Sequence, residues 1–444
     1  MDASSLPSNS SLQRDADEAA QALQLLRHVI TPEWVDALCP SSPQTVFTGY
    51  IIVWMLIYQR LHHNAPLTSA VSMFLQQMAS LSSSKRVQEK TLSTQTGGFS
   101  RARQRFPVAV AEHIADHVFQ SLLPAASTLL PGRRVFLVDG STIKLRPQKE
   151  LHERWPAGLQ GSPWPICQLV VLHELETGMM LRPEAGPMYG DDAISEMSLA
   201  EPLLKRLPVH SVLMADIGFG VFSFAFAATQ AGHDVVLRLK KDRFVSMQRK
   251  ATPVRPGVWQ LCWKPTAENR QSFPELPADA EVKVFLHEFT GYSGQQMWVL
   301  TTLSIETDQV AKLYARRAEV ETDIRQWKKP LKLDELRGKS VEMILKELAI
   351  GSVTYNLVVQ VRRLAAERGK IAPRRISFTG VWYLLMPMIT DPRERTMEEW
   401  QQEGDLLLKR ALQLKIPHRP NRSYPRTAYR KSFSYDKKDF GKGS

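Results

Sequence analysis

Few features of this sequence are those of a secreted or membrane protein. Its 444 residues include only three cysteines, Cys39, Cys167 and Cys262, which are too scattered to form a CxxC pair. An odd number of widely separated cysteines supports neither a disulfide framework nor a zinc knuckle, so a reducing compartment is expected. The N-terminal segment is polar and acidic, without a basic stretch followed by an apolar one, so no signal peptide is expected.

Long hydrophobic runs and two common catalytic loops are also missing. The most apolar stretch, residues 46–58, falls short of the roughly 18 residues that a membrane span needs, which favours a buried helix. The sequence contains neither a GxxxxGK phosphate-binding loop nor a GxSxG nucleophile elbow. Nucleotide hydrolysis and serine-hydrolase chemistry are therefore not expected.

The overall composition is that of a globular protein with a basic surface. Hydrophobic residues make up 43% of the chain and charged residues 23%, and a chain of 444 residues predicts two or three structural units. The formal net charge is +12 and the isoelectric point is about 9.5. Such a charge favours a polyanionic partner, because it attracts phosphates and releases counterions.

The pattern of apolar residues changes along the chain. Residues 1–130 show helical spacing, and short β-branched runs that predict strands follow, in RVFLVD, QLVVLHEL and SVLMAD. Two further strands, EVKVFLHEF and QQMWVLTTL, are predicted around a glycine-bearing turn. Helices are then predicted over residues 307–327 and 341–367. Residues 417–444 form a tail with eight Lys and Arg against two Asp.

Two of the predicted strands lead into aspartates. RVFLVDG places Asp139 after one apolar run, and SVLMADIG places Asp216 after another. In open α/β sheets, functional groups gather at the carboxyl ends of strands, where two carboxylates lie close enough to share divalent metal ions. For either aspartate alone, the alternative that it only begins a turn stays open.

A third carboxylate lies on a predicted helix. At about 100° per residue, Glu321 shares one helical face with Tyr314, Arg317, Arg325 and Lys328, whereas Glu319 and Asp323 point elsewhere. A carboxylate flanked by a phenol and three cations suits a metal ion and the phosphates beside it. The alternative is a solvated face with i,i+4 ion pairs.

These residues carry a family resemblance. The order Tyr-x2-Arg-x3-Glu-x6-Lys, met by Tyr314, Arg317, Glu321 and Lys328, resembles the signature of the insertion-sequence-four family of DDE transposases. Asp139-Gly-Ser-Thr resembles the first-aspartate motif of that family. Asp216-Ile-Gly-Phe resembles the second, with Ile217 where an arginine is common. Weaker matches extend over residues 100–107, 355–358 and 422–426, and to Glu347.

The resemblance implies an architecture and a reaction. It implies an α/β fold: a ribonuclease-H-like core over residues 131–366, with a β-rich insertion at about 241–294. A helical DNA-binding and assembly region would precede it at 1–130, and a C-terminal region with the basic tail would follow at 367–444. The implied enzyme cleaves element ends and transfers strands on double-stranded DNA, as a homodimer in the DNA complex. It would work without a membrane, in the bacterial cytoplasm at the nucleoid.

The resemblance also implies roles for the site residues. Asp139, Asp216 and Glu321 would hold two Mg²⁺ ions, with Mn²⁺ as a substitute, for an in-line displacement. Tyr314, Arg317 and Lys328, with Arg325 on the same face, would contact phosphates beside the scissile bond. Two other functions stay open: a transposase descendant that binds DNA without cutting it, and a glycosidase that uses paired carboxylates.

Other residues have weaker claims to a function. His113 and His117 have zinc-binding spacing but no third ligand, so a plain helix face is favoured. Trp259 and Trp263 fit packing within the insertion better than stacking on an extruded base. Two basic clusters are interpreted as a DNA track, with a solvated surface as the alternative: Arg101, Arg103 and Arg105, and Arg238, Lys240, Lys241 and Arg243.

Overall fold

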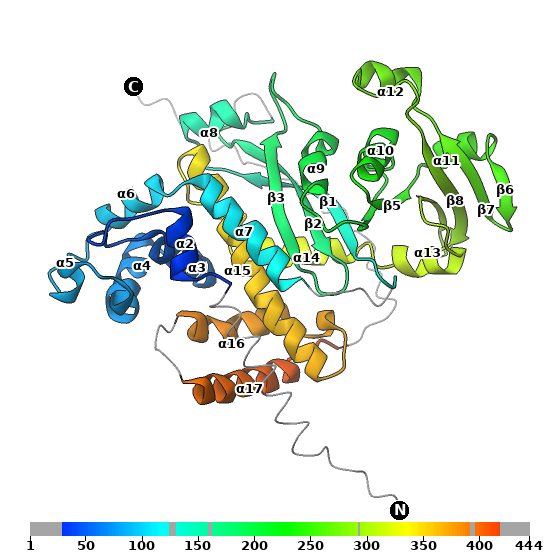
Figure 1. Cartoon of the computed structure of the whole chain (residues 1–444). Coiled ribbons are helices and arrows are strands. Elements are labelled where there is room, and N and C mark those ends of the chain that lie inside the picture. The colour runs from blue at the N-terminus through cyan, green and yellow to red at the C-terminus, as the bar shows by residue number, and fades with distance from the viewer. Residues whose placement is uncertain (1–28, 124–129, 159–161, 292–293, 391–395, 418–444) are drawn as a thin grey trace, which may run out of the picture.

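The computed structural model describes residues 29–123, 130–158, 162–291, 294–390 and 396–417 (Figure 1). It is a mixed α/β structure in which one large sheet lies beside a group of helices. The basic tail predicted at residues 417–444 lies outside the described residues except for its first position. Within the described ranges, no helix is long and apolar enough to cross a membrane.

The sheet has nine strands in the order β3-β2-β1-β4-β5-β9-β8-β7-β6. β1 pairs with β4 and β4 with β5 in parallel, and the other neighbours are antiparallel. The strands are β1 (Val135–Lys144), β2 (Ile166–Glu174), β3 (Met180–Pro187), β4 (Val212–Ala215), β5 (Asp234–Arg238), β6 (Thr252–Arg255), β7 (Val258–Trp263), β8 (Val282–Thr290) and β9 (Gln296–Thr301).

All five predicted strands are present, and one of them is longer than expected. β1 does not end at Asp139, because pairing with β2 continues from Asp139 opposite Val171 to Lys144 opposite Ile166. Its parallel pairing with β4 stops earlier, at Val138 opposite Ala215. Asp139 therefore lies within β1, at the point where the strand extends past its parallel neighbour.

Alternate residues of the central strands enter two separate cores. Phe136 and Val138 of β1 belong to the large core that also contains α9 (Glu196–Leu204) and α10 (Phe222–Gln230). Val135 and Leu137 belong to a smaller core, together with residues of α13 (Thr307–Tyr314) and α14 (Glu319–Lys328). The period of two along a strand thus assigns each side chain to one face or the other.

The predicted insertion extends the same sheet. β9 pairs on one side with β5 and on the other with β8, so the later strands continue the sheet from β5 outward. Two short helices, α11 (Lys241–Gln248) and α12 (Ala267–Ser272), belong to this segment and lie beside its strands in Figure 1. The turn at Gly291 and Gly294 joins β8 to β9, as the sequence predicts.

In the described part of the N-terminal region, residues 29–123, the structure is helical as predicted. α3 is buried along nearly its whole length, which explains the most apolar stretch of the sequence. Between η2 and α6 lies one short helix, α5. The helical segments are α2 (Pro32–Leu38), α3 (Gly49–Leu61), α4 (Leu67–Met73), η1 (Phe74–Met78), η2 (Ala79–Leu81), α5 (Lys85–Gln88), α6 (Gly97–Arg105) and α7 (Val108–Leu122).

One long helix, α15 (Val341–Arg368), joins the N-terminal helices to the sheet. In Figure 1 it runs between α7 and the pair formed by α16 (Phe378–Thr390) and α17 (Met397–Gln413). It also packs on β3 and α3. Almost every residue of its middle turns is buried. The remaining short helices are α8 (Lys149–Arg154) and η3 (Pro373–Arg375).

Candidate active site

Sheet register brings the two aspartates together. Val138 lies opposite Ala215, so the next residues of the two chains, Asp139 and Asp216, are neighbours. Because side chains alternate along a strand, both aspartates lie on the face of the sheet that carries the smaller core and the α13–α14 segment. The Asp139 Oδ1 accepts a hydrogen bond from the Gly140 N–H at 2.9 Å. The Asp216 Oδ1 accepts one from the Gly218 N–H at 2.9 Å, which fixes the direction of each carboxylate.

Both aspartates and Glu321 converge on one guanidinium group. The Arg317 Nη2 lies 3.1 Å from the Asp139 Oδ2 and 3.5 Å from the Asp216 Oδ2. The Arg317 Nη1 lies 3.6 Å from the Glu321 Oε1. The structure thus brings together the three carboxylates that the sequence singles out, with Arg317 between them.

Burial sets the ionisation of Asp139. Its side chain is 19% exposed, against 41% for Asp216. Burial raises the pKa of Asp139 to about 6, Arg317 opposes this shift, and the nearby charge of Asp216 adds to it. A cation beside these carboxylates is therefore favourable, because it offsets both desolvation and mutual repulsion.

The other residues predicted on the Glu321 face have different surroundings. The Tyr314 ring is buried in the smaller core, and its hydroxyl donates to the Ala215 carbonyl at 3.4 Å. Burial raises the pKa of Tyr314. The Lys328 Nζ donates to the Ser141 Oγ at 2.7 Å and to the Thr142 carbonyl at 2.6 Å, joining the end of α14 to β1. Arg325 is exposed to solvent.

The single helix predicted over residues 307–327 is wrong in one respect, because it breaks at residues 315–318. The Arg316 N–H donates to the Leu313 carbonyl and the Arg317 N–H to that of Tyr314, both at 3.0 Å. These i→i+3 bonds tighten the turn, so α13 ends at Tyr314 and α14 begins at Glu319. Arg317 lies in this turn, yet it still contacts Glu321.

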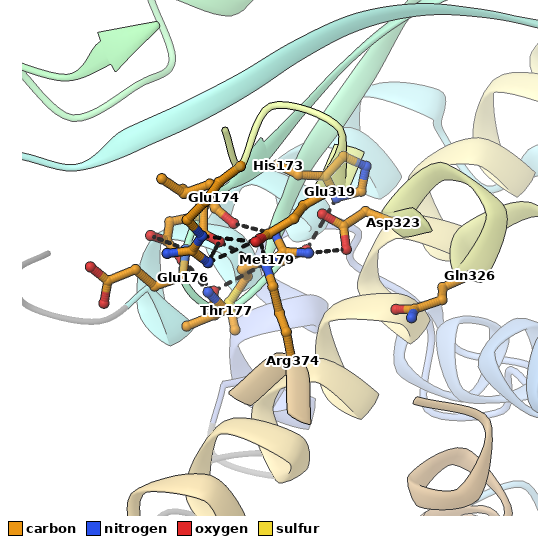
Figure 2. Close-up of polar contacts among 12 residues, drawn as sticks. His173, Glu174, Glu176, Thr177, Met179, Glu319, Asp323, Gln326 and Arg374 are labelled. Atoms are coloured by element: carbon orange, nitrogen blue, oxygen red, sulfur yellow. Dashed lines mark hydrogen bonds and ion pairs between the residues drawn. The ribbon is translucent and has the colours of Figure 1, made fainter. Parts of the chain in front are cut away.

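The opposite side of α14 is anchored by a buried charge network (Figure 2). Asp323 is fully buried, and its Oδ1 accepts a hydrogen bond from the Arg374 Nη1 at 2.5 Å. The Glu319 Oε2 forms an ion pair with Arg374, at 2.8 Å from its Nε. Burial lowers the pKa of Arg374, but Asp323 and Glu319 more than offset this and the pKa is raised overall. Glu319 and Asp323 point away from Glu321, as the helical spacing predicts.

The same network ties α14 to the turn between β2 and β3. Arg374 also donates to the carbonyls of Glu174 and Leu175, at 3.2 and 2.8 Å. Arg362 of α15 donates to the Gln326 Oε1 at 3.1 Å and to the Thr177 carbonyl. Figure 2 shows Arg374 reaching into this group from below, between Glu174 and Asp323. The network holds the helix that carries Glu321 against the sheet.

Sequence reasoning missed two charged groups beside the aspartates. Glu196, the first residue of α9, lies so close to Gly140 that a Cβ there would be 1.9 Å from its Oε1. Burial raises the pKa of Glu196, the charge of Asp216 adds to this, and a hydrogen bond from Gln168 opposes it. No motif marks Glu196 in the sequence. Arg238 was assigned only to a basic cluster, but it follows Leu237, which lies opposite Ala215 in the neighbouring strand.

The remaining candidates have structural contacts. His113 and His117 both lie against the Trp34 ring, with ring centroids 5.8 and 4.4 Å away. Trp259 packs on Phe244, and Trp263 packs on Phe222. These contacts agree with the packing role that the sequence favours for the tryptophans.

The basic clusters are divided among several environments. Arg101 and Arg105 are exposed on α6, whereas Arg103 of the same helix is partly buried. Arg243 donates to the Gly220 carbonyl, and the Lys241 Nζ lies 5.9 Å from the centroid of the Trp298 ring. Only part of each cluster therefore presents free charge at the surface.

The donor set at the site is suited to a hard divalent cation, with one condition. Carboxylate oxygens are the ligands that Mg²⁺ takes in proteins. In the ranges that the structure describes, no three His, Cys, Asp or Glu side chains are arranged to hold a metal ion as they stand. Arg317 lies among the three carboxylates instead, so they fit a metal ion only if its guanidinium moves aside.

Comparisons with known proteins point to one family. A family model described as a transposase DDE domain matches residues 130–357, slightly more than half of the chain. No curated protein matches. Among solved structures, the cryo-EM structure of the piggyBac transposase synaptic complex with hairpin DNA is similar at a TM-score of 0.44 and 13% sequence identity. That match covers 91% of this chain and 87% of the other.

Proposed function

Because the chain belongs to the proteins with a transposase DDE domain, we propose that it is an insertion-sequence transposase. It cleaves element ends and joins them to target DNA at a site formed by Asp139, Asp216 and Glu321. The observation that carries this proposal is the convergence of these three carboxylates on the Arg317 guanidinium. They come from three distant segments, and the fold collects their negative charge at one point.

The proposal assigns the metal ions to this carboxylate set. Asp139, Asp216 and Glu321 would hold two Mg²⁺ ions, for which Mn²⁺ would substitute. Bound there, the ions supply charge that stabilises the attacking and leaving oxygens of an in-line phosphoryl displacement. In the structure Arg317 balances the carboxylates. With the ions in place, the Arg317 guanidinium would be free to bind a phosphate beside the scissile bond.

The strand order supports a ribonuclease-H-like core. Three antiparallel strands, β3-β2-β1, are followed by β4 and β5 in parallel with β1, and the aspartates lie on β1 and directly after β4. The spacing of Tyr314, Arg317, Glu321 and Lys328 supports placement in the insertion-sequence-four family. In this proposal Tyr314 and Lys328 act mainly by positioning the α13–α14 segment on the central strands, since both contact backbone or side-chain atoms of those strands.

The proposed partner is double-stranded DNA, both as the element ends and as the target. The net charge of +12 supports this, because a basic protein gains affinity by releasing counterions from DNA. A homodimer in the DNA complex and action at the bacterial nucleoid, in the cytoplasm, are parts of the same proposal.

The function is tested by incubating the purified full chain with the terminal DNA of its element. With Mg²⁺, we expect strand cleavage at the element boundary, and with excess EDTA we expect none. The measurement is the appearance of cleaved ends on a denaturing gel. Binding without cleavage at any Mg²⁺ or Mn²⁺ concentration would instead indicate a descendant that only binds DNA. Metal-independent hydrolysis of a glycoside would indicate the glycosidase alternative.

Replacing Arg317 should slow cleavage after DNA has bound. Loss of a charge-assisted contact at the reacting phosphate costs about 3 kcal/mol of barrier, or about a hundredfold in rate. Arg317→Lys should recover only part of the rate, because an ammonium group cannot reproduce the fork of a guanidinium. Single-turnover cleavage of a pre-bound end measures the effect.

The control for this experiment is Lys312→Ala, which removes an exposed cation from the preceding helix. It should cut at the wild-type rate. Without Arg317 the three carboxylates repel one another. Adding Mg²⁺ should therefore raise the melting temperature of Arg317→Ala by more than it raises that of the wild type. An Arg317→Ala protein that cuts normally once bound would exclude a role at the phosphate.

A further inference from the structure

A second charged cavity lies away from the carboxylate site, between the N-terminal helices and the start of α15. Its volume is about 190 Å³, well beyond the roughly 10–15 Å³ that a single water molecule needs. Its walls come from α3, α4, α6, α15 and the segments that follow α3 and α14, and its polar and charged lining residues are Gln59, Arg60, Asn64, Arg103, Arg337 and Glu347.

One wall of this cavity is a buried ion pair. The Arg60 Nη2 lies 2.8 Å from the Glu347 Oε2, and both side chains are only 4% exposed. The Glu347 Oε2 also accepts a hydrogen bond from the Arg337 N–H at 3.0 Å. The Arg60 Nη1 donates to the Lys332 carbonyl at 3.3 Å, so this guanidinium is held in place from two sides.

Two more arginines lie near this ion pair. Burial lowers the pKa of Arg103, Glu347 opposes this, and Arg60 lowers it further. Burial also lowers the pKa of Arg60, Glu347 opposes this, and Arg337 lowers it further. Arg60 is therefore close enough to both other arginines for mutual repulsion. The Arg103 Nε is buried and has no hydrogen-bond partner among the described residues.

The cavity consequently has a surplus of positive charge. Three arginines face one glutamate, a net of +2 among the ionisable residues that line it. The polar neighbours are neutral and already bonded: the Gln59 Nε2 donates to the Ala65 carbonyl, and the Asn64 Nδ2 donates to that of Glu335. Uncompensated charge in a partly desolvated cavity favours an anion, and guanidinium groups match the geometry of phosphate.

We propose that this cavity binds one phosphate group of a DNA strand, with Arg103 and Arg337 as the donors and the Arg60–Glu347 pair as a fixed charge behind them. The phosphate chemistry follows from the three arginines, while the choice of DNA as its source rests on the proposed function. The segment that carries Arg337 links α14 to α15, and its backbone accepts hydrogen bonds from Arg60 and Asn64. A bound phosphate thus joins the N-terminal helices to the chain that follows Glu321.

The first test uses inorganic phosphate as the probe and thermal melting of the full chain as the readout. Saturating phosphate should raise the wild-type melting temperature by about 2 °C relative to chloride at equal ionic strength. Arg103→Gln and Arg337→Gln should each lose this shift. The matched controls are Arg105→Gln on the same helix and Lys339→Gln on the same connecting segment, both exposed, and they should keep it.

The unliganded variants provide a check on folding. Because burial of the Arg103 charge and repulsion by Arg60 together outweigh its attraction to Glu347, Arg103→Gln without phosphate should melt no lower than the wild type. If it melts several degrees lower, Arg103 serves to stabilise Glu347 and the proposal is overturned. Absence of a phosphate-specific shift in the wild type also overturns it.

The second test identifies DNA as the source of the phosphate. Removing one phosphate contact should flatten the plot of log affinity against log salt concentration by about 0.9. The single variants Arg103→Gln and Arg337→Gln and their double variant should all show this same loss, because both arginines bind one phosphate. The control Lys339→Gln, an exposed cation on the segment that carries Arg337, should leave the slope unchanged.

The outcomes separate this proposal from the proposed function. An inorganic phosphate shift with an unchanged DNA slope would overturn the assignment to DNA. An equal loss of slope in Lys339→Gln would indicate a diffuse basic surface and overturn the single site. If the wild type cuts element ends but the cavity variants keep the wild-type phosphate shift and salt slope, only this inference fails. If the cavity binds phosphate but the wild type does not cut element ends, only the proposed function fails.

Discussion

Replacing any one of the three carboxylates should abolish end cleavage while DNA binding largely survives. We expect Asp139→Ala, Asp216→Ala and Glu321→Ala each to lose about a thousandfold or more in single-turnover rate, since each removes charge that stabilises the transition state. The losses should be similar, because all three side chains face the same point. The measurement is cleavage of a pre-bound element end, with binding followed separately by gel shift.

Glu319→Ala is the matched control for Glu321→Ala. It removes a carboxylate from the same helix, but from the side that contacts Arg316 and Arg374. It should lower the melting temperature yet still cut at a temperature where it is folded. If Glu319→Ala were folded but inactive while Glu321→Ala cut normally, the assignment of the helix face would be wrong.

Local periodicity pointed to the three carboxylates, although for either aspartate alone it left open a simple turn. Asp139 follows the apolar first half of β1 and Asp216 follows β4, and alternation along the strands assigns both to the same face of the sheet. Glu321 is separated from Arg317 by four residues, a spacing at which side chains meet on a helix. Relative placements of this kind can be predicted because they depend on the geometry of one strand or one helix at a time.

The interactions that surround the carboxylates could not be predicted in the same way. The ion pair between Asp323 and Arg374 joins residues 51 positions apart, and the contact of Glu196 with Gly140 depends on how α9 packs on the sheet, against β2 and β3. Helical spacing shows that Asp323 points away from Glu321, but it does not name a partner. Long-range pairings of this kind are decided by tertiary packing, for which a single sequence has no local signal.

Two deviations in local structure have the same origin. The turn at residues 315–318 interrupts a sequence that has good helical spacing, and there the Arg316 Nη2 donates to the Leu175 carbonyl at 3.0 Å. The pairing of β9 with β5 turns the predicted insertion into an extension of the central sheet. In both cases contacts with a distant segment determine where an element ends or what it pairs with.

The buried network behind α14 explains how the fold keeps Glu321 in place. Asp323 is fully buried, so its charge depends on Arg374, which in turn depends on Glu319 and on the carbonyls of Glu174 and Leu175. A buried ion pair contributes little compared with apolar packing, but removal of one partner leaves an uncompensated charge. The α14 helix should therefore be sensitive to single substitutions on the side that faces away from the site.

Asp323→Ala is expected to lower the free energy of unfolding by about 3–5 kcal/mol, because it leaves the Arg374 guanidinium buried without its main partner. Asp323→Asn keeps one acceptor oxygen and should cost less. Asp308→Ala, which removes an exposed aspartate from α13, is the control and should stay within about 0.5 kcal/mol of the wild type. Denaturant unfolding of the three variants gives the values.

At a temperature where Asp323→Asn is folded, its cleavage rate should also fall while its DNA affinity does not, since a loosened α14 misplaces Glu321. An Asp323→Ala protein as stable as the Asp308→Ala control would show that the pair does not anchor this helix, and the position of Glu321 would then have to depend on the Lys328 contact with Ser141 instead.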